Sequence, residues 1–130
     1  MNIGEAAKKS NLTVKTVRYY ANIELVKPKR NILSGYRVYS NEDIEKLLFV
    51  GKARKFDFSI TECRELLELY DNNERSSSEV KKITLNKIKD IQKRMSELSC
   101  LEEELARLAL GCNGDDRPNC PIIGFLAEED

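Results

Sequence analysis

The chain has 130 residues, of which 41% are hydrophobic and 34% are charged, with 22 basic and 22 acidic side chains. This composition excludes a disordered chain, and the lack of an apolar run of about eighteen residues excludes a membrane-spanning segment. Four cysteines in a chain that starts without a basic, apolar leader predict a cytoplasmic protein with reduced thiols.

The charges are separated along the chain although they cancel overall. Residues 1–56 contain twelve Lys and Arg against five Asp and Glu, a balance of +7, and residues 57–130 contain ten against seventeen, a balance of −7. A basic half joined to an acidic half is typical of a protein that neutralises nucleic-acid phosphates with one part only. Chance segregation of solvated charge is the alternative.

Two short helices are expected near the N-terminus, over residues 3–9 and 14–20, and their tight connection describes a helix-turn-helix. Thr13 is the expected N-cap of the second helix. With Val14 and Val17 facing the core, the outward face of that helix suits the major groove of double-stranded DNA. The candidate DNA-binding residues here are Thr13, Lys15, Thr16, Arg18, Tyr19 and the adjacent Tyr20.

Residues 27–39 are typical of a two-stranded hairpin with Ser34-Gly35 in its loop. The alternation after Gly35 places Arg37 on the opposite face from Tyr36. Tyr36, Arg37 and Tyr39 are candidate DNA-binding residues, with Arg37 and one of the two tyrosines as phosphate contacts. Arg54, at the end of the next helix, adds another cation. Each of these residues alone is more often a solvated surface side chain, and only their combination favours DNA.

Capping boxes predict three further helix starts, at Ser40, Ser59 and Ser76, because each serine is followed three residues later by an acid. The helix over residues 76–110 is apolar on one face, which a chain this small cannot bury alone. The pattern therefore predicts a coiled-coil homodimer, with packing against its own domain as the alternative. Gly111 is expected to end the helix in the left-handed conformation.

Cys112 and Cys120 flank a seven-residue polar loop that can bring their sulfurs together. Cys120 precedes Pro121, a favoured first residue of a helix, so its thiolate is expected at a helix N-terminus. Zn(II) prefers four ligands and the chain has no His, whereas soft thiolates select Cu(I) and its heavier relatives. Ordinary thiols and a redox pair remain alternatives. Cys63 and Cys100 are expected to be buried or half-buried structural residues.

Several of these stretches resemble the MerR family of winged-helix regulators. They are residues 2–7 (Asn-Ile-Gly-Glu-Ala-Ala), 16–20 (Thr-Val-Arg-Tyr-Tyr) and 35–39 (Gly-Tyr-Arg-Val-Tyr). The resemblance implies an antiparallel coiled-coil dimer on a pseudo-palindromic promoter. It also implies that the activated dimer distorts the promoter so that RNA polymerase can engage it. The expected fold is mainly α-helical: a winged helix-turn-helix domain (1–71), a dimerisation helix (76–110) and a metal-binding loop with a short helix (111–130).

Within the family, the spacing of Cys112 and Cys120 and the Pro-Ile-Ile that follows are similar to the copper-efflux regulators. This implies Cu(I), Ag(I) or Au(I) as effector and efflux or detoxification genes as targets. In the family's divalent sensors a cysteine at the start of the dimer helix reaches the partner's site. Ser77 occupies the matching position here, which implies monovalent selectivity, with helix capping as its other role.

Other functions stay open at this point. The same thiols suit a sensor of oxidants or electrophiles, and a small copper carrier without a DNA role is a more distant alternative. An enzyme is not expected, because the chain has no His, no glycine-rich phosphate loop and no nucleophile with a base beside it. The roles of Asp115 and Asp116 are left open.

Overall fold

The computed structural model describes residues 1–112, 114 and 120–128. The predictions that concern Asp115 and Asp116 lie outside the described residues. The chain divides into two compact units, Met1–Thr84 and Leu85–Asp130, which are described separately. No helix within the described part of the chain is long and apolar enough to cross a membrane.

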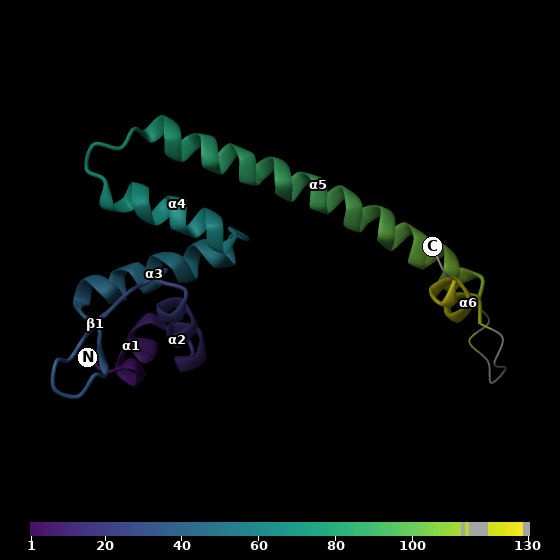
Figure 1. Ribbon diagram of the computed structural model, residues 1–130. Helices are drawn as coiled ribbons and strands as arrows, with labels where there is room; N and C mark the ends of the chain where they lie inside the picture. Colours follow the sequence, from purple (N-terminus) through teal and green to yellow (C-terminus); the bar gives the residue numbers. More distant parts are fainter. Residues whose placement is uncertain (113, 115–119, 129–130) are drawn as a thin grey trace. The chain divides into compact units, whose positions relative to one another are not determined.

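The N-terminal unit begins with the two expected helices, α1 (Ile3–Ser10) and α2 (Val14–Asn22), shown in purple in Figure 1. Asn2 Oδ1 accepts a hydrogen bond from the Glu5 backbone N–H at 2.8 Å and caps α1. The helix ends at Asn11, whose φ of 56° is left-handed. This short turn, followed at once by the cap of α2, confirms the helix-turn-helix.

A small β-hairpin follows, formed by β1 (Lys29–Arg30) and β2 (Arg37–Val38). The strands are antiparallel, with Lys29 opposite Val38 and Arg30 opposite Arg37. Gly35 has a φ of +73° in the connecting loop, a conformation that favours glycine. The hairpin with its loop, residues 29–38, is called the wing below, and it confirms the predicted hairpin.

Helices α3 (Asn41–Lys55) and α4 (Ile60–Asp71) complete this unit together with the start of α5. Both begin with the predicted reciprocal capping boxes, at Ser40 and Ser59. The core is a cluster of apolar side chains drawn from α1, α2, the segments on either side of the wing, α3 and α4, which fixes both ends of the wing and α2 on one scaffold. Its most buried large members are Val17, Val26, Tyr39, Leu47, Val50 and Cys63.

Helix α5 (Ser77–Leu110) is 34 residues long and is followed by the short α6 (Pro121–Ala127). At its start, Ser76 Oγ accepts a hydrogen bond from the Glu79 backbone N–H at 3.3 Å, the serine half of the expected capping box. Gly111 follows the helix as predicted, but its φ is not left-handed. Its N–H donates to the Arg107 carbonyl at 3.2 Å, so the backbone continues in the helical direction past Leu110.

Candidate nucleic-acid interface and metal centre

The N-cap of α2 holds the start of this helix and its polar face. Thr13 Oγ1 accepts a hydrogen bond from the Thr16 backbone N–H at 3.1 Å and donates one to Thr16 Oγ1 at 2.8 Å. Lys15, Arg18 and Tyr19 are exposed, and Thr16 is half-buried. The predicted outward face is therefore on the surface. Contact of these side chains with DNA stays a prediction.

Val14 departs from the expectation that it faces the core, because 37% of its surface is exposed. It is the first residue of α2. Val17, one turn further along the same helix, is fully buried, as predicted.

Two of the tyrosines assigned to DNA lie in the core instead. Tyr20 is 5% exposed and Tyr39 only 1%. Burial raises the pKa of both phenols, while Arg54 beside Tyr20 and Arg37 near Tyr39 act against that rise. The Tyr39 hydroxyl is buried and has no hydrogen-bond partner among the described residues. The assignment of these two side chains to the DNA surface was wrong, because both rings belong to the buried apolar cluster of the N-terminal unit.

The backbone of Tyr39 shows how the wing is anchored. Its N–H donates to the Met1 carbonyl at 2.7 Å, and its carbonyl accepts from the Met1 ammonium at 2.8 Å. This reciprocal pair ties the residue after β2 to the residues before α1. Tyr36, three residues earlier, is 79% exposed, so it is the tyrosine of the hairpin that is available to a ligand.

Cationic side chains line two clefts between α2 and the wing. One cleft of about 430 Å³ is lined by Asn2, Ile3, Arg18, Arg30, Gly35, Tyr36 and Arg37. The other, of about 610 Å³, is lined by Ala21, Asn22, Glu24, Lys27, Pro28, Arg30 and Arg37. Both contain the guanidinium groups of Arg30 and Arg37, which suits them to phosphate oxygens.

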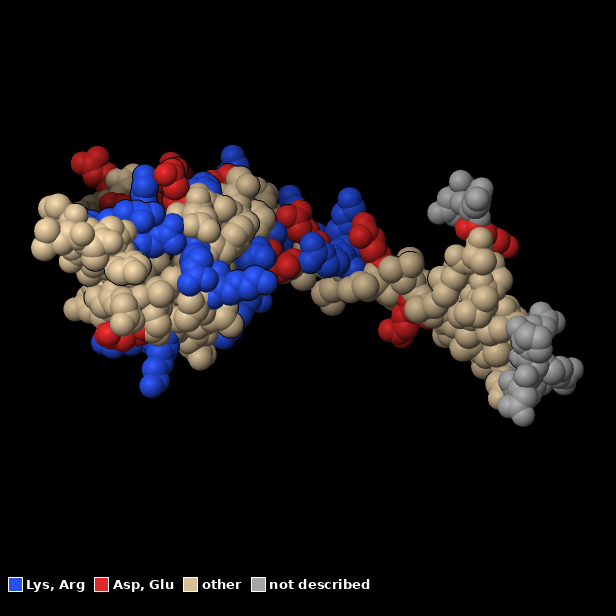
Figure 2. Space-filling view, turned by 60° about the horizontal axis from the view of Figure 1, so that its bottom comes forward, with Lys and Arg blue, Asp and Glu red and all other residues tan. Residues whose placement is uncertain are grey.

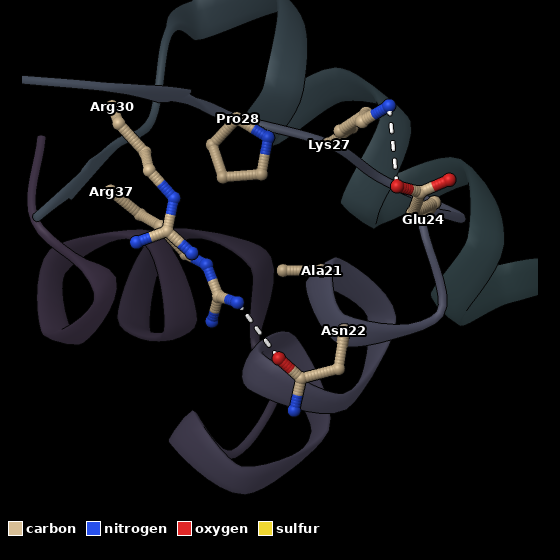
Figure 3. Close-up of a pocket in the computed structure, with 7 residues that line it drawn as sticks. All are labelled: Ala21, Asn22, Glu24, Lys27, Pro28, Arg30 and Arg37. Atoms are coloured by element: carbon tan, nitrogen blue, oxygen red, sulfur yellow. Dashed lines mark hydrogen bonds and ion pairs between the residues drawn. The ribbon is translucent and has the colours of Figure 1, made fainter. Parts of the chain in front are cut away.

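Figure 3 shows how the second cleft holds its cations. Arg30 and Arg37 project into the same space from paired strands, and Arg37 Nη2 donates to Asn22 Oδ1 at 2.7 Å. Lys27 pairs with Glu24 at 3.4 Å on the opposite wall. Arg30, Asn22 and Lys27 were missed from the sequence. The hairpin register carried the signal for Arg30, because it places this residue opposite Arg37.

Arg54 is exposed at the end of α3, as expected, but it also has an internal role. Its Nη1 donates to the Phe58 carbonyl at 2.8 Å and so closes the turn between α3 and α4.

Figure 2 shows Lys and Arg side chains spread across the visible face of the N-terminal unit. A cationic surface of this kind, with a capped helix beside it, is chemically suited to a polyanion.

The two C-terminal cysteines lie together. Cys112 Sγ and Cys120 Sγ are 3.7 Å apart, and both residues are half-buried. A disulfide bond is about 2.05 Å long, so the sulfurs are in contact as thiols. Metal–thiolate bonds of about 2.3 Å, the value for zinc, allow two sulfurs on one ion to be up to about 4.6 Å apart. The pair therefore fits around a single ion with little adjustment.

Cys120 has the environment of a reactive thiol. It is the N-cap residue of α6, with Pro121 as the first helical residue, as predicted. The backbone N–H groups of Ile123 and Ile122 lower the pKa of the Cys120 thiol against a smaller opposing effect of burial, and the neighbouring Cys112 thiol contributes least to the lowering. A thiolate at this position is stabilised before any ligand arrives.

The remaining cysteines do not join the pair. Cys63 is fully buried in the core of the N-terminal unit, as expected, whereas Cys100 is exposed on α5, contrary to expectation. Across the residues that the structure describes, no group of three or more His, Cys, Asp or Glu side chains could hold a metal ion. Ser77 is the first residue of α5 and is exposed.

The chain matches two protein-family profiles that together cover most of its length. The profile of MerR HTH family regulatory proteins matches residues 1–69, and the profile named MerR, DNA binding matches residues 44–108. The chain belongs to the MerR family. This confirms the resemblance seen in the helix-turn-helix and wing motifs. MerR proteins and the matched relatives are transcription regulators and not enzymes.

Close relatives match over almost the whole chain. The HTH-type transcriptional regulator HmrR of Rhizobium leguminosarum bv. viciae is 43% identical, over 98% of this chain and 98% of its own. The HTH-type transcriptional regulator CueR of Salmonella typhimurium is 40% identical, over 98% of this chain and 92% of its own. The alignments with both relatives therefore include α5 and the segment that contains the two cysteines after it.

Two solved structures of MerR regulators share the fold. PbrR691 from Ralstonia metallidurans CH34, in complex with lead(II), has a TM-score of 0.81 and 33% identity, covering 98% of this chain and 99% of its own. MerR from Bacillus megaterium MB1, in complex with mercury(II), has a TM-score of 0.68 and 30% identity, covering 98% and 100%. The mainly helical fold with its long C-terminal helix is therefore a MerR fold.

Proposed function

We propose that this MerR protein is a regulator that responds to a monovalent soft metal ion and binds promoter DNA as a homodimer. In this proposal Cys112 and Cys120 hold Cu(I), Ag(I) or Au(I), and the loaded protein activates efflux or detoxification genes. The observation that carries the proposal is the 3.7 Å contact between the two sulfurs. Two thiolates suffice for a monovalent soft ion, whereas Zn(II) is usually held by four ligands.

The relatives support a metal ion as the effector but do not identify which ion binds, so the identity of the ion is inferred from the ligand atoms of this chain. CueR is a close relative, whereas the solved relatives hold lead(II) and mercury(II). The argument for a monovalent ion rests on this chain's own donors, since two half-buried cysteines are the sulfur ligands that the described residues bring together. The lowered pKa of Cys120 favours the thiolate form that such ions require.

A homodimer is supported by the surface of α5. Its apolar side chains are about half exposed or more along most of the helix, from Leu85 and Ile88 through Met95, Leu98 and Leu101 to Leu105. An uninterrupted helix with one apolar stripe is stabilised when a second copy covers that stripe. We infer an antiparallel pair, which is the arrangement that the resemblance to the MerR family implies for this 34-residue helix. In that arrangement the partner's Ser77 would lie near Cys112 and Cys120.

On DNA, we place α2 in the major groove, with Thr13, Lys15, Thr16, Arg18 and Tyr19 towards the duplex. Tyr36 and Arg37 then lie near the backbone phosphates, and Arg54 adds a cation at the edge of the same unit. Paired domains at a pseudo-palindromic promoter would change the shape of the DNA between the half-sites, and RNA polymerase would respond to that change.

The test is a metal titration of the reduced protein. Cu(I) and Zn(II) are titrated against competing chelators, with the Cys112→Ser protein in parallel and Cys100→Ser as the matched control. We expect tight uptake of one Cu(I) per chain, lost in Cys112→Ser and retained in Cys100→Ser, with weak Zn(II) binding. Tight Zn(II) binding would show that further ligands reach the site and would contradict the assignment of Ser77.

A second candidate function is a thiol-based sensor of oxidants or electrophiles. The same sulfur contact and the lowered pKa of Cys120 favour it, because a thiolate is the reactive form of cysteine. It predicts that peroxide or an aldehyde activates transcription in the absence of metal. Tight Cu(I) binding without activation by peroxide would exclude it.

A further inference from the structure

The tip of the wing carries two aliphatic side chains that contact almost nothing in their own chain. Ile32 is 99% exposed and Leu33 is 97% exposed. Single exposed apolar side chains are ordinary on protein surfaces. Two neighbouring ones at full exposure add nothing to the core and lower solubility. Figure 1 shows the loop that bears them projecting from the helices beside the N-terminus.

The loop is held in shape before any partner binds. Asn31 Oδ1 accepts hydrogen bonds from the backbone N–H groups of Leu33 at 2.9 Å and Ser34 at 3.1 Å. The Gly35 N–H donates to the Asn31 carbonyl at 2.8 Å, and the Asn31 N–H donates to the Tyr36 carbonyl at 2.8 Å. Little backbone freedom is left to lose on binding, which favours the use of this tip as a contact.

Cations surround the base of the same loop. Lys29 and Arg30 precede it and Arg37 follows it, and Arg30 Nη1 donates to the Gly35 carbonyl at 3.0 Å. Arg30 and Arg37 also line the clefts between α2 and the wing. An apolar loop tip with positively charged side chains around its base is complementary to a partner that has an apolar strip between two lines of negative charge. The minor groove of duplex DNA has this character, with sugars and base edges between the phosphates.

We propose that Ile32 and Leu33 form a wedge that enters the minor groove beside the major-groove segment bound by α2. The proposal rests on DNA binding by the N-terminal unit and adds to it an apolar contact that phosphate-binding cations do not supply. Aliphatic side chains of this kind can insert between base steps, unstack them and bend the duplex. Binding by the wing would therefore depend on how easily the flanking DNA is deformed, in addition to the contacts that the wing makes with the phosphate backbone of that DNA.

The test compares two double variants of the full chain. Ile32→Ser with Leu33→Ser removes the apolar surface, whereas Ile32→Leu with Leu33→Ile keeps it as a matched control. Binding is measured by fluorescence anisotropy over a series of salt concentrations, on a duplex that the unmodified protein selects from a random-sequence library. We expect the serine variant to bind about tenfold more weakly, as when roughly one aliphatic side chain loses a buried contact. The control stays within about twofold, since its apolar surface is kept.

Salt dependence separates this contact from the cations. Neither double variant changes charge, so the slope of log affinity against log salt stays the same, whereas Arg37→Gln lowers that slope by about one. The duplex also carries 2-aminopurine at successive steps of its outer minor-groove segments. Its fluorescence rises at one step with the unmodified protein and the control, and the rise is lost with the serine variant.

Unchanged affinity and unchanged 2-aminopurine fluorescence in the serine variant would overturn the wedge. If transcription then falls in the same variant, the tip contacts a protein and not DNA. Because both side chains are exposed, thermal unfolding of the variant is expected to match the unmodified protein. A protein that selects no duplex at all would instead contradict DNA binding itself, so the two failures are distinguishable. The metal titration is independent of both.

Discussion

Replacing Tyr39 with Phe is expected to stabilise the protein. The Tyr39 ring is 1% exposed, and its hydroxyl has no hydrogen-bond partner among the described residues. A buried polar group without a partner costs about 1–3 kcal/mol of folding free energy, and removing it while keeping the ring recovers part of this cost. We therefore expect the free energy of unfolding to rise by about 1 kcal/mol.

Tyr20 provides the matched control. It is almost as buried, but the Arg54 side chain forms a hydrogen bond to its hydroxyl. Tyr20→Phe removes that bond and leaves Arg54 at the surface, where water can solvate it. A bond of this kind is worth about 0.5–1.5 kcal/mol, or more when one partner is charged, so this variant should be less stable than the unmodified protein.

Urea unfolding at one fixed protein concentration measures both variants, because the stability of the proposed homodimer would depend on concentration. The two midpoints should move in opposite directions, with no change in the denaturant slope. Equal destabilisation by both substitutions would refute the reasoning, because it would show that the Tyr39 hydroxyl has a partner. A large loss of DNA affinity in Tyr39→Phe would show that this hydroxyl reaches a phosphate after all.

Three further predictions address the cap and the thiols. Thr13→Ala removes the N-cap of α2 and should cost about 1 kcal/mol of stability in urea unfolding, whereas Thr13→Ser should be near neutral. The pKa of Cys120 is lowered in the folded state, so its thiolate is favoured above that pKa and lost as the pH falls through it. The rate at which iodoacetamide modifies Cys120 should therefore reach half its maximum at a lower pH in the native protein than in urea. Equal midpoint pH values would contradict the lowered pKa of Cys120. Ser77→Cys should raise Hg(II) affinity in chelator competition, because the proposed antiparallel dimer would bring the new thiol to the partner's pair. No change in affinity would argue against that dimer.

The local features of the fold could be predicted because they depend on neighbouring residues. The caps at Thr13, Ser40 and Ser59 each satisfy backbone N–H groups three residues away, and all three form as expected. The hairpin could be predicted for the same reason, because Gly35 supplies the left-handed residue that its loop needs. Family motifs then supplied the order of these elements.

The exposure of individual side chains could not be read from the sequence in the same way. Tyr36 and Tyr39 are both aromatic residues of the predicted hairpin segment, yet the first is on the surface and the second belongs to the buried core. Cys100 occurs within a helix whose apolar face has no cover in a single chain, so it is exposed. Gly111 looked like a left-handed cap, but the helical direction continues through it.

The sulfur pair was predictable in part. A polar loop of seven residues can close, and Cys112 and Cys120 meet at its ends. Arg30 was missed because a cation before a hairpin has no distinctive neighbours in sequence, and only the strand register places it beside Arg37. Contacts that depend on register or on a third element need coordinates, whereas contacts along the chain do not.

The complete burial of Cys63 gives the molecule a built-in indicator of its own unfolding. Its thiol lies in the core formed by α3, α4 and the helix-turn-helix, while Cys100, Cys112 and Cys120 all reach the surface. A thiol reagent added to the native protein therefore modifies three positions promptly and the fourth only when the N-terminal unit opens. The slow labelling of this one cysteine measures how often the DNA-binding unit opens, without an added probe and in the presence of any ligand that leaves the reagent intact.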